Sequence, residues 1–207
     1  MSTIALFGGS GRTGMRLLER LLKDGHDVRL LSRREVEPRE RLTVIIGDAT
    51  DADAITKTVQ SADVVISALG TDKQNVLSRF TPLVISAMQV NGVTRILTVG
   101  TAGILQAHDM DAYRFETRES KRTMTTAAED HAHAYELLRD SDFDYTVVCP
   151  TQLIDEPSDG DIVITPDELG TLHSGPISRD DVADLVVKAW EENNYIRHRV
   201  GITTESR

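Results

Sequence analysis

Residues 3–23 read TIALFGGSGRTGMRLLERLLK. The apolar run Thr3–Phe7 predicts a β-strand, and leucines at helical spacing predict a helix over Thr13–Lys23. Between the two, glycines 8, 11 and 14 have the spacing GxxGxxG, which allows a tight strand-to-helix turn and lets the backbone approach a pyrophosphate. The pyrophosphate would lie at the helix N-terminus, where free N–H groups favour an anion. We therefore predict a dinucleotide-binding turn rather than a plain glycine-rich one, with contacts from Gly8, Ser10, Gly11, Arg12, Thr13 and Gly14.

The alternation of strands and helices continues along the chain. Further strands are expected over His26–Ser32, Leu42–Ile46, Ala62–Ala68, Arg95–Val99 and Tyr145–Cys149, and further helices over Asp51–Val59, Arg79–Asn91 and Thr117–Asp140. Repeated βαβ units imply a parallel sheet with right-handed crossovers and helices on both faces. The fold class expected is therefore α/β, a Rossmann-type doubly wound parallel sheet, built as a single domain over residues 1–207.

The pattern changes after Pro150. Short strands are expected over Asp161–Thr165 and Val200–Thr204, and a helix over Asp181–Glu192. Ser178 is the expected N-cap of that helix, with Asp181 in the capping-box position, where aspartate is a weaker partner than glutamate. Because this tail is too small for a domain of its own, we expect residues 151–207 to form a small C-terminal lid that contributes to the substrate pocket.

Composition limits the partners of the chain. Its 207 residues carry a formal net charge of −10, which argues against nucleic acid or an anionic membrane as the main partner. An anionic cofactor therefore needs local cations. The single cysteine, Cys149, excludes an intramolecular disulfide and fits a reducing compartment. With no long apolar run and no basic n-region at the start, we expect a soluble cytoplasmic protein whose partner is a small molecule; the oligomeric state stays open.

The end of the second strand bears on the choice of cofactor. It reads Leu31-Ser32-Arg33-Arg34, without the acidic residue that would bind the ribose 2′-hydroxyl of NAD. Arginine at this place suits a 2′-phosphate, which it can bind bidentately. Arg12 could add a second cation from the glycine turn. The sequence thus favours NADP (NADPH) over NAD; the alternative is that Arg33 and Arg34 are solvated loop charges.

Asp48 and Ala49 follow the third strand within residues 47–51, GDATD. The Asp48 carboxylate could accept a hydrogen bond from the adenine amino group. It could equally serve the turn or cap the helix that begins near Asp51. Both interpretations stay open from the sequence.

Five stretches together resemble a known superfamily: GGSGRTG (8–14), SRR (32–34), GDATD (47–51), ISALGT (66–71) and residues 131–155. They are similar to the atypical short-chain dehydrogenase/reductases, in the NAD(P)H-binding branch with biliverdin-IXβ reductase/flavin reductase and NmrA-like proteins. The match runs from Ile4 to about Asp155, with a looser match over ISRDDVAD (177–184). The resemblance implies cofactor contacts from Ala68, Leu69, Gly70, Thr101, Pro150, Thr151, Gln152 and Leu153. It also places Thr101 and His131 as catalytic candidates beside the substrate.

The chain departs from the wider superfamily in lacking the Tyr-x-x-x-Lys pair. The fourth residue after Tyr113 is Thr117, after Tyr135 it is Arg139, and after Tyr145 it is Cys149. That pair lowers a tyrosine pKa for proton exchange with an alcohol or carbonyl. Flavins and quinones accept hydride into a conjugated ring and can take the proton from water. We therefore expect an NAD(P)H-dependent reductase of a flavin, quinone or similar acceptor; the alternative is an NmrA-like redox sensor without catalysis.

Two other residue types yield simpler expectations. His131 and His133 are two positions apart on an expected helix, so they point to different faces and do not form a metal pair. We expect no metal site. Cys149 ends an apolar strand before a proline, which favours a buried inert thiol over a nucleophile.

Overall fold

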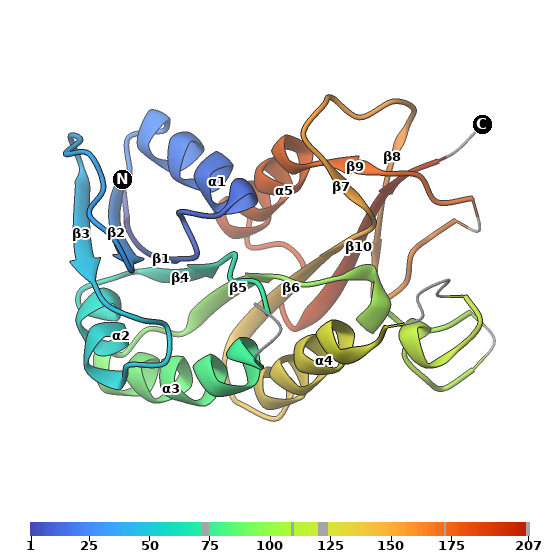
Figure 1. Cartoon of the computed structure of the whole chain (residues 1–207), viewed down its shortest axis with the longest axis horizontal. Helices are drawn as coiled ribbons and strands as arrows, with labels where there is room; N and C mark the ends of the chain where they lie inside the picture. Colours follow the sequence, from blue (N-terminus) through green and yellow to red (C-terminus); the bar gives the residue numbers. More distant parts are fainter. Residues whose placement is uncertain (72–74, 109, 120–123, 172, 206–207) are drawn as a thin grey trace.

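The computed structural model describes residues 1–71, 75–108, 110–119, 124–171 and 173–205. Its main sheet has the strand order β3-β2-β1-β4-β5-β6-β10-β8 (Figure 1). The bounds of these strands are β1 Thr3–Phe7, β2 Asp27–Ser32, β3 Leu42–Ile46, β4 Val64–Ser67, β5 Arg95–Val99, β6 Asp144–Pro150, β8 Ile162–Pro166 and β10 His198–Thr204. All neighbours in this order are parallel except β8, which is antiparallel to β10. The order reverses between β1 and β4, as in a doubly wound Rossmann-type sheet, so the expected fold class is confirmed.

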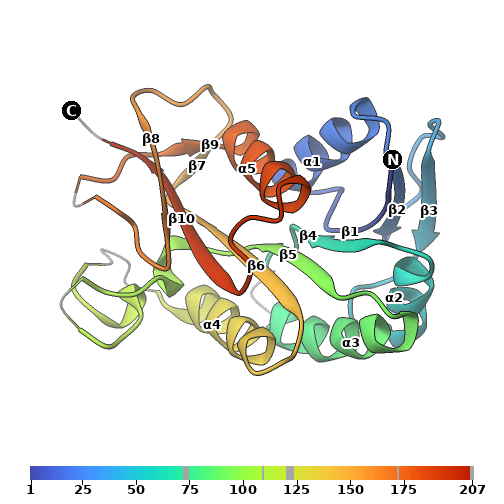
Figure 2. The ribbon, with the colours of Figure 1, turned by 180° about the vertical axis from the view of Figure 1, so that it is seen from behind.

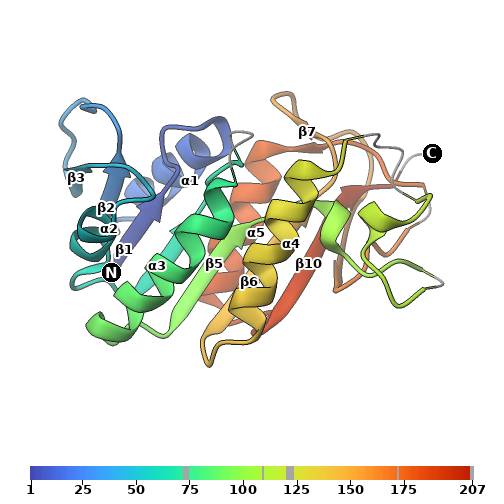
Figure 3. The ribbon, with the colours of Figure 1, turned by 60° about the horizontal axis from the view of Figure 1, so that its bottom comes forward.

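Helices cover both faces of the sheet (Figures 1 and 2). Helices α1 (Arg12–Lys23) and α5 (Arg179–Glu191) pack side by side on one face. Figure 3 shows α3 (Val76–Asn91) beside α4 (Thr126–Arg139) on the other face, where α2 (Ala52–Val59) also lies. Each face of the sheet packs against its helices through an apolar core. Successive side chains of β1 alternate between these cores: Ile4 and Leu6 pack on the α1/α5 face, and Ala5 and Phe7 pack on the opposite face.

The predicted start of the helix over Thr117–Asp140 is wrong. The expectation was a largely continuous helix over Thr117–Asp140, but α4 begins at Thr126. In the described residues before it, a 3₁₀ turn, η2 (Arg114–Glu116), is followed by residues 117–119, which are not helical; residues 120–123 are outside the described residues. The physical reason at residues 117–119 is that the polar sequence TRE offers no apolar face to bury, so a helix there gains nothing from packing.

The C-terminal tail forms part of the main sheet and of its helical cover. Its strands β10 and β8 extend the main sheet, and α5 packs against α1. The separate two-stranded ribbon of β7 (Leu153–Ile154) and β9 (Ile177–Ser178) lies between β6 and α5 in the chain.

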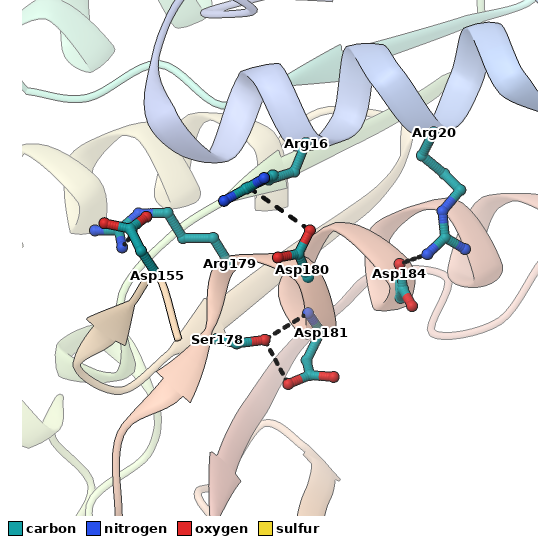
Figure 4. Close-up of polar contacts among 8 residues, drawn as sticks. All are labelled: Arg16, Arg20, Asp155, Ser178, Arg179, Asp180, Asp181 and Asp184. Carbon is teal, nitrogen blue, oxygen red and sulfur yellow. Dashed lines mark hydrogen bonds and ion pairs between the residues drawn. The ribbon is translucent and has the colours of Figure 1, made fainter. Parts of the chain in front are cut away.

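The expected N-cap of α5 is confirmed, and its reciprocal half is altered. The Ser178 hydroxyl accepts a hydrogen bond from the Asp181 backbone N–H (3.0 Å) (Figure 4). The short Asp181 carboxylate does not reach the Ser178 backbone; that N–H donates to the Ser158 hydroxyl (2.8 Å), which in turn donates to Asp181 (2.5 Å). The Ser158 hydroxyl thus bridges the gap between the Ser178 N–H and the Asp181 carboxylate, which a longer glutamate side chain would span directly.

Two arginines are buried at the β5–β6–β10 end of the sheet. Arg95 donates to the backbone oxygen of Asp144 and to the Thr146 hydroxyl, both at 2.8 Å. Arg199 donates to the backbone oxygen of Ile104 (2.5 Å), and its guanidinium carbon lies 4.7 Å from the centroid of the Tyr135 ring. These long side chains tie the C-terminal strands to the loops and helices around them.

Candidate functional site

The glycine turn joins β1 to α1 by close backbone approach. Gly8 has φ +77°, and its carbonyl oxygen accepts a hydrogen bond from the Gly11 N–H (2.9 Å). A Cβ at Gly14 would lie 2.0 Å from that same oxygen, and a Cβ at Gly8 would lie 2.6 Å from the backbone of Ala68. Only glycine satisfies these positions, so the GxxGxxG spacing corresponds to a compact turn.

The first turn of α1 suits an anion. Gly11 is the N-cap residue and has no side chain to cap the helix, and the first turn contains no acidic residue. Its N–H groups are therefore available to a ligand, and the helix dipole favours negative charge there.

A groove of about 230 Å³ lies beside this turn, at the carboxyl ends of β1 to β4. Nine of the predicted cofactor residues line it: Gly8, Ser10, Gly11, Arg33, Asp48, Ala49, Ala68, Leu69 and Gly70. Four further lining residues, Leu31, Ser32, Gly47 and Val76, were not predicted. The first three could have been found, since they end β2 and follow β3. Val76 could not, because it begins a helix distant in sequence from the glycine turn.

The three arginines predicted for the 2′-phosphate differ in position. Arg33 lines the groove. The backbone of Arg34 is tied to the Ser32 hydroxyl, which accepts from its N–H (3.2 Å) and donates to its carbonyl (2.7 Å). Arg12 is exposed and places Nη1 3.3 Å from Oδ2 of Asp155, beyond β7. The geometry therefore supports Arg33 as the groove cation, and the roles of Arg12 and Arg34 stay predictions.

Asp48 stabilises the turn after β3, which is one of the two roles that the sequence left open. Its Oδ1 accepts hydrogen bonds from the Thr50 hydroxyl (2.7 Å) and the Thr50 N–H (2.9 Å). These bonds, with the charges of Arg33 and Arg79, lower the pKa of Asp48, so it is a carboxylate at neutral pH. The N-cap of α2 is Asp51, which accepts from the Asp53 N–H (3.0 Å). Asp48 both shapes the turn and lines the groove, and its contact with adenine stays a prediction.

The residues expected around the nicotinamide and substrate differ in burial. Thr101 is buried and caps the short 3₁₀ helix η1 (Ala102–Ile104). The Thr151 hydroxyl donates to the Gly175 carbonyl (2.7 Å), and Leu153 belongs to β7. Pro150 ends β6, and Gln152 is exposed.

His131 lines a small cavity of about 20 Å³ between α3, α4 and the sheet. The other lining residues with polar groups are Ser67, Thr81, Thr98 and Tyr135, and the rest of the wall is apolar. Thr101 is not among the lining residues. The structure therefore does not bring the two catalytic candidates, His131 and Thr101, into this one cavity.

A residue next to His131 was missed by sequence reasoning. Asp130 on α4 is buried and caps the start of α3, where it accepts from the N–H groups of Leu77 (3.1 Å) and Ser78 (2.9 Å) and from the Ser78 hydroxyl. The N-cap residue Asn75 has left-handed backbone (φ 53°) and no side-chain cap of its own. Asp130 thus fixes the end of α3 that carries Val76 into the groove. Local sequence holds no signal for a cap supplied from another helix.

Cys149 is fully buried, as expected for an inert thiol. Burial raises the pKa of its thiol to about 12, so the nucleophilic thiolate is absent near neutral pH. Within the described ranges, no group of three His, Cys, Asp or Glu side chains could hold a metal ion. In that same part of the chain, no helix is long and apolar enough to cross a membrane.

The sequence matches a model of the NAD(P)H-binding family over residues 8–193. The chain belongs to this family. The match begins in the glycine turn and extends through α5, so it includes the groove as well as most of the C-terminal tail. Together with the fold, it confirms the resemblance to the atypical short-chain dehydrogenase/reductase superfamily.

This NAD(P)H-binding protein has relatives with different names. It is 28% identical to an uncharacterized sugar epimerase of Bacillus subtilis, over 92% of this chain and 89% of the relative. A Streptococcus pneumoniae protein named as a proposed NADH-flavin reductase shares the fold with a TM-score of 0.85 and 23% identity, over 99% of this chain and 100% of that one. A Veillonella parvula short-chain dehydrogenase/reductase in complex with NADP has a TM-score of 0.77 and 20% identity, over 97% and 94%. The two structures establish the common fold.

Proposed function

We propose that this protein is an NADPH-dependent oxidoreductase that reduces a flavin, a quinone or a similar conjugated small molecule. The observation that carries the proposal is the groove at the carboxyl ends of β1 to β4, which combines the glycine turn, the uncapped start of α1 and the cation Arg33. This is the place where a doubly wound sheet binds a dinucleotide.

Each wall of the groove has a role toward the cofactor. The backbone N–H groups at the start of α1 bind the pyrophosphate. Arg33 at the end of β2 binds the 2′-phosphate of NADP, and this contact is the basis on which we propose NADP over NAD. The Veillonella protein of the same fold, in complex with NADP, is compatible with this assignment. When bound, NADPH supplies the hydride, and the chain contributes orientation and exclusion of water.

Tyr113 and Tyr145 favour an acceptor that needs no proton from either of them. Burial, with the nearby Glu136 carboxylate, raises the pKa of Tyr113 to about 12. Burial, with Tyr135 beside it, likewise raises the pKa of Tyr145 to about 12. A tyrosine that exchanges protons with an alcohol needs a lowered pKa. A conjugated acceptor that takes its proton from water fits these environments better, with Thr101 and His131 orienting it.

A second function is an NmrA-like redox sensor that binds NADP(H) without catalysis. It is favoured by the absence of Thr101 from the residues that line the His131 cavity. In either function we place the protein in a reducing cytoplasm, because its one cysteine is an unpaired, buried thiol.

The test is NADPH oxidation with FMN, riboflavin and a benzoquinone as acceptors, combined with NADPH titration. His131→Ala should keep NADPH affinity and lower turnover by about tenfold or less, without removing a titration step near pH 6.5. The control is His133→Ala, an exposed histidine on the same helix, which should leave the rate unchanged. A loss above about a thousandfold, with disappearance of that step, would make His131 the proton donor. NADPH binding without turnover of any of these acceptors would favour the sensor.

A further inference from the structure

Asp155 lies between two arginines that come from opposite parts of the chain. Its Oδ1 accepts a hydrogen bond from Nη1 of Arg179, the first residue of α5, at 2.9 Å (Figure 4). Its Oδ2 faces Nη1 of Arg12, the first residue of α1, at 3.3 Å. One carboxylate therefore connects the start of the glycine-turn helix with the start of α5.

The two halves of this arrangement differ in burial. The Arg179 side chain is 6% exposed, whereas that of Arg12 is 73% exposed and that of Asp155 is 47% exposed. Exposed ion pairs are weak because water and salt screen them. Arg12 can therefore leave Asp155 easily, and the buried Arg179 still compensates the Asp155 charge after it has left.

Arg12 is attached to the helix end that suits a phosphate. The first turn of α1 contains no acidic residue, and its N–H groups have no side-chain cap. The chain as a whole carries a net charge of −10, so an anionic cofactor depends on cations placed beside its phosphates.

We propose that Asp155 holds Arg12 as a reserve cation, which exchanges its weak bond to Asp155 for the cofactor pyrophosphate. This inference rests on the proposed function, because it requires the glycine turn to bind a dinucleotide. Asp155 then acts as a competitor for Arg12 and sets how tightly the cofactor is held. Arg179 is the positioning residue that keeps the carboxylate in place in both states.

The neighbouring ion pairs supply a matched control. Arg16 lies 3.6 Å from Asp180, and Arg20 pairs with Asp184, one helical turn further along α1 and α5 (Figure 4). These pairs join the same two helices but do not involve Arg12. Neutralising Asp180 therefore removes a comparable exposed charge from the same surface without releasing Arg12.

The experiment measures affinity and release rate for NADPH and NADH in the full chain by fluorescence titration and stopped flow. Asp155→Asn, which keeps an oxygen for Arg179, should tighten both cofactors by about fivefold through slower release. Both should respond equally because both carry the pyrophosphate. Arg12→Gln should weaken both cofactors, and adding Asp155→Asn to Arg12→Gln should then change nothing. Asp180→Asn should leave both affinities unchanged, and urea unfolding checks that each variant folds.

If the wild-type protein binds the cofactor, several outcomes would overturn the Arg12 exchange without overturning the proposed function. These are unchanged or weaker binding by Asp155→Asn, equal tightening with and without Arg12, or equal tightening by Asp180→Asn. An effect confined to NADPH would place Arg12 at the 2′-phosphate and also defeat the exchange at the pyrophosphate. If Asp155→Asn does not fold, Arg12→Gln decides, since unchanged binding of both cofactors contradicts the proposal. Absence of any NADPH or NADH binding by the wild type would instead defeat the proposed function itself.

Discussion

The glycine-turn region and the C-terminal sheet region are held together in different ways. In the first, neighbouring backbone atoms make the decisive contacts, such as the Gly11 N–H with the Gly8 carbonyl. In the second, buried arginines reach residues far away in sequence: Arg95 donates to Asn194 and Arg199 to Ile104. The binding region therefore depends on conformations that glycine alone allows, and the C-terminal region on the length of specific side chains.

The glycine turn and the buried arginines differ in their energetic cost. The glycine turn buries no charge, whereas burial lowers the pKa of Arg95 to about 10, which reports the cost of keeping a guanidinium out of water. Among the described residues, the Nε atoms of Arg95 and Arg199 lack a hydrogen-bond partner. Both Nη atoms of Arg95, and Nη1 of Arg199, donate to carbonyl or hydroxyl oxygens. We expect substitutions in the two regions to separate binding from stability.

The largest effect is expected for Gly14→Val. Its Cβ would lie 2.0 Å from the Gly8 oxygen, so the turn must rearrange. We expect loss of NADPH binding together with about 3 kcal/mol of folding stability, measured by urea unfolding. Gly11→Val is the matched variant, because a Cβ there meets the Gly8 oxygen at 3.3 Å. It should abolish NADPH binding while costing about 1 kcal/mol or less. Equal unfolding curves for the two variants would contradict this distinction.

Arg199→Met tests the C-terminal region. It removes a buried cation from between aromatic rings, its bond to Ile104, and its contact with the half-exposed Asp167. We expect a loss of about 2–3 kcal/mol in stability with NADPH affinity changed by about twofold or less. Arg139→Met is the control, since Arg139 lies 5.9 Å from the same Tyr135 ring but is half-exposed. An affinity loss in Arg199→Met as large as its stability loss would show that the two regions are not separable.

Arg33→Ala sharpens the comparison within the binding region. A charge-assisted bond to a 2′-phosphate is worth about 1.5–3 kcal/mol, so NADPH should bind about tenfold to a hundredfold more weakly. NADH, which lacks that phosphate, should be nearly unaffected. Arg34→Ala is the comparison variant: Arg34 is adjacent and exposed but is not among the residues lining the groove, so its loss should weaken NADPH binding less than Arg33→Ala does. Equal weakening of both cofactors would remove Arg33 from the 2′-phosphate.

The smallest effect concerns Cys149. Its pKa is raised by burial to about 12 in the folded protein, from an ordinary value of 9.0. Its proton is therefore retained by the folded state and lost by the unfolded state above pH 9. This contribution to stability is fully present below pH 9 and is lost as the pH rises from 9 toward 12. A maleimide or disulfide reagent at pH 8 should label Cys149 only after unfolding in urea; rapid labelling of the folded protein would contradict the burial.

The sequence by itself determined the features that depend on nearby residues. The bounds of β1, β3 and β5 follow from their apolar and β-branched runs, and the glycine turn follows from the spacing of Gly8, Gly11 and Gly14. The groove could also be located, because parallel strands place the loops after β1, β2, β3 and β4 at one edge. Strand periodicity and glycine conformation are local properties, which is why they can be read from the chain.

Only the tertiary structure decided the contacts between distant segments. Asp130 caps α3 from another helix, 53 residues beyond Leu77, and Asp155 meets Arg12 across 143 residues. The same holds for the tail, whose strands join the main sheet through β10, and for the start of α4. These features depend on which side chains meet after the sheet has assembled. That information lies in packing, since a short polar segment has many possible partners and its own sequence does not choose among them.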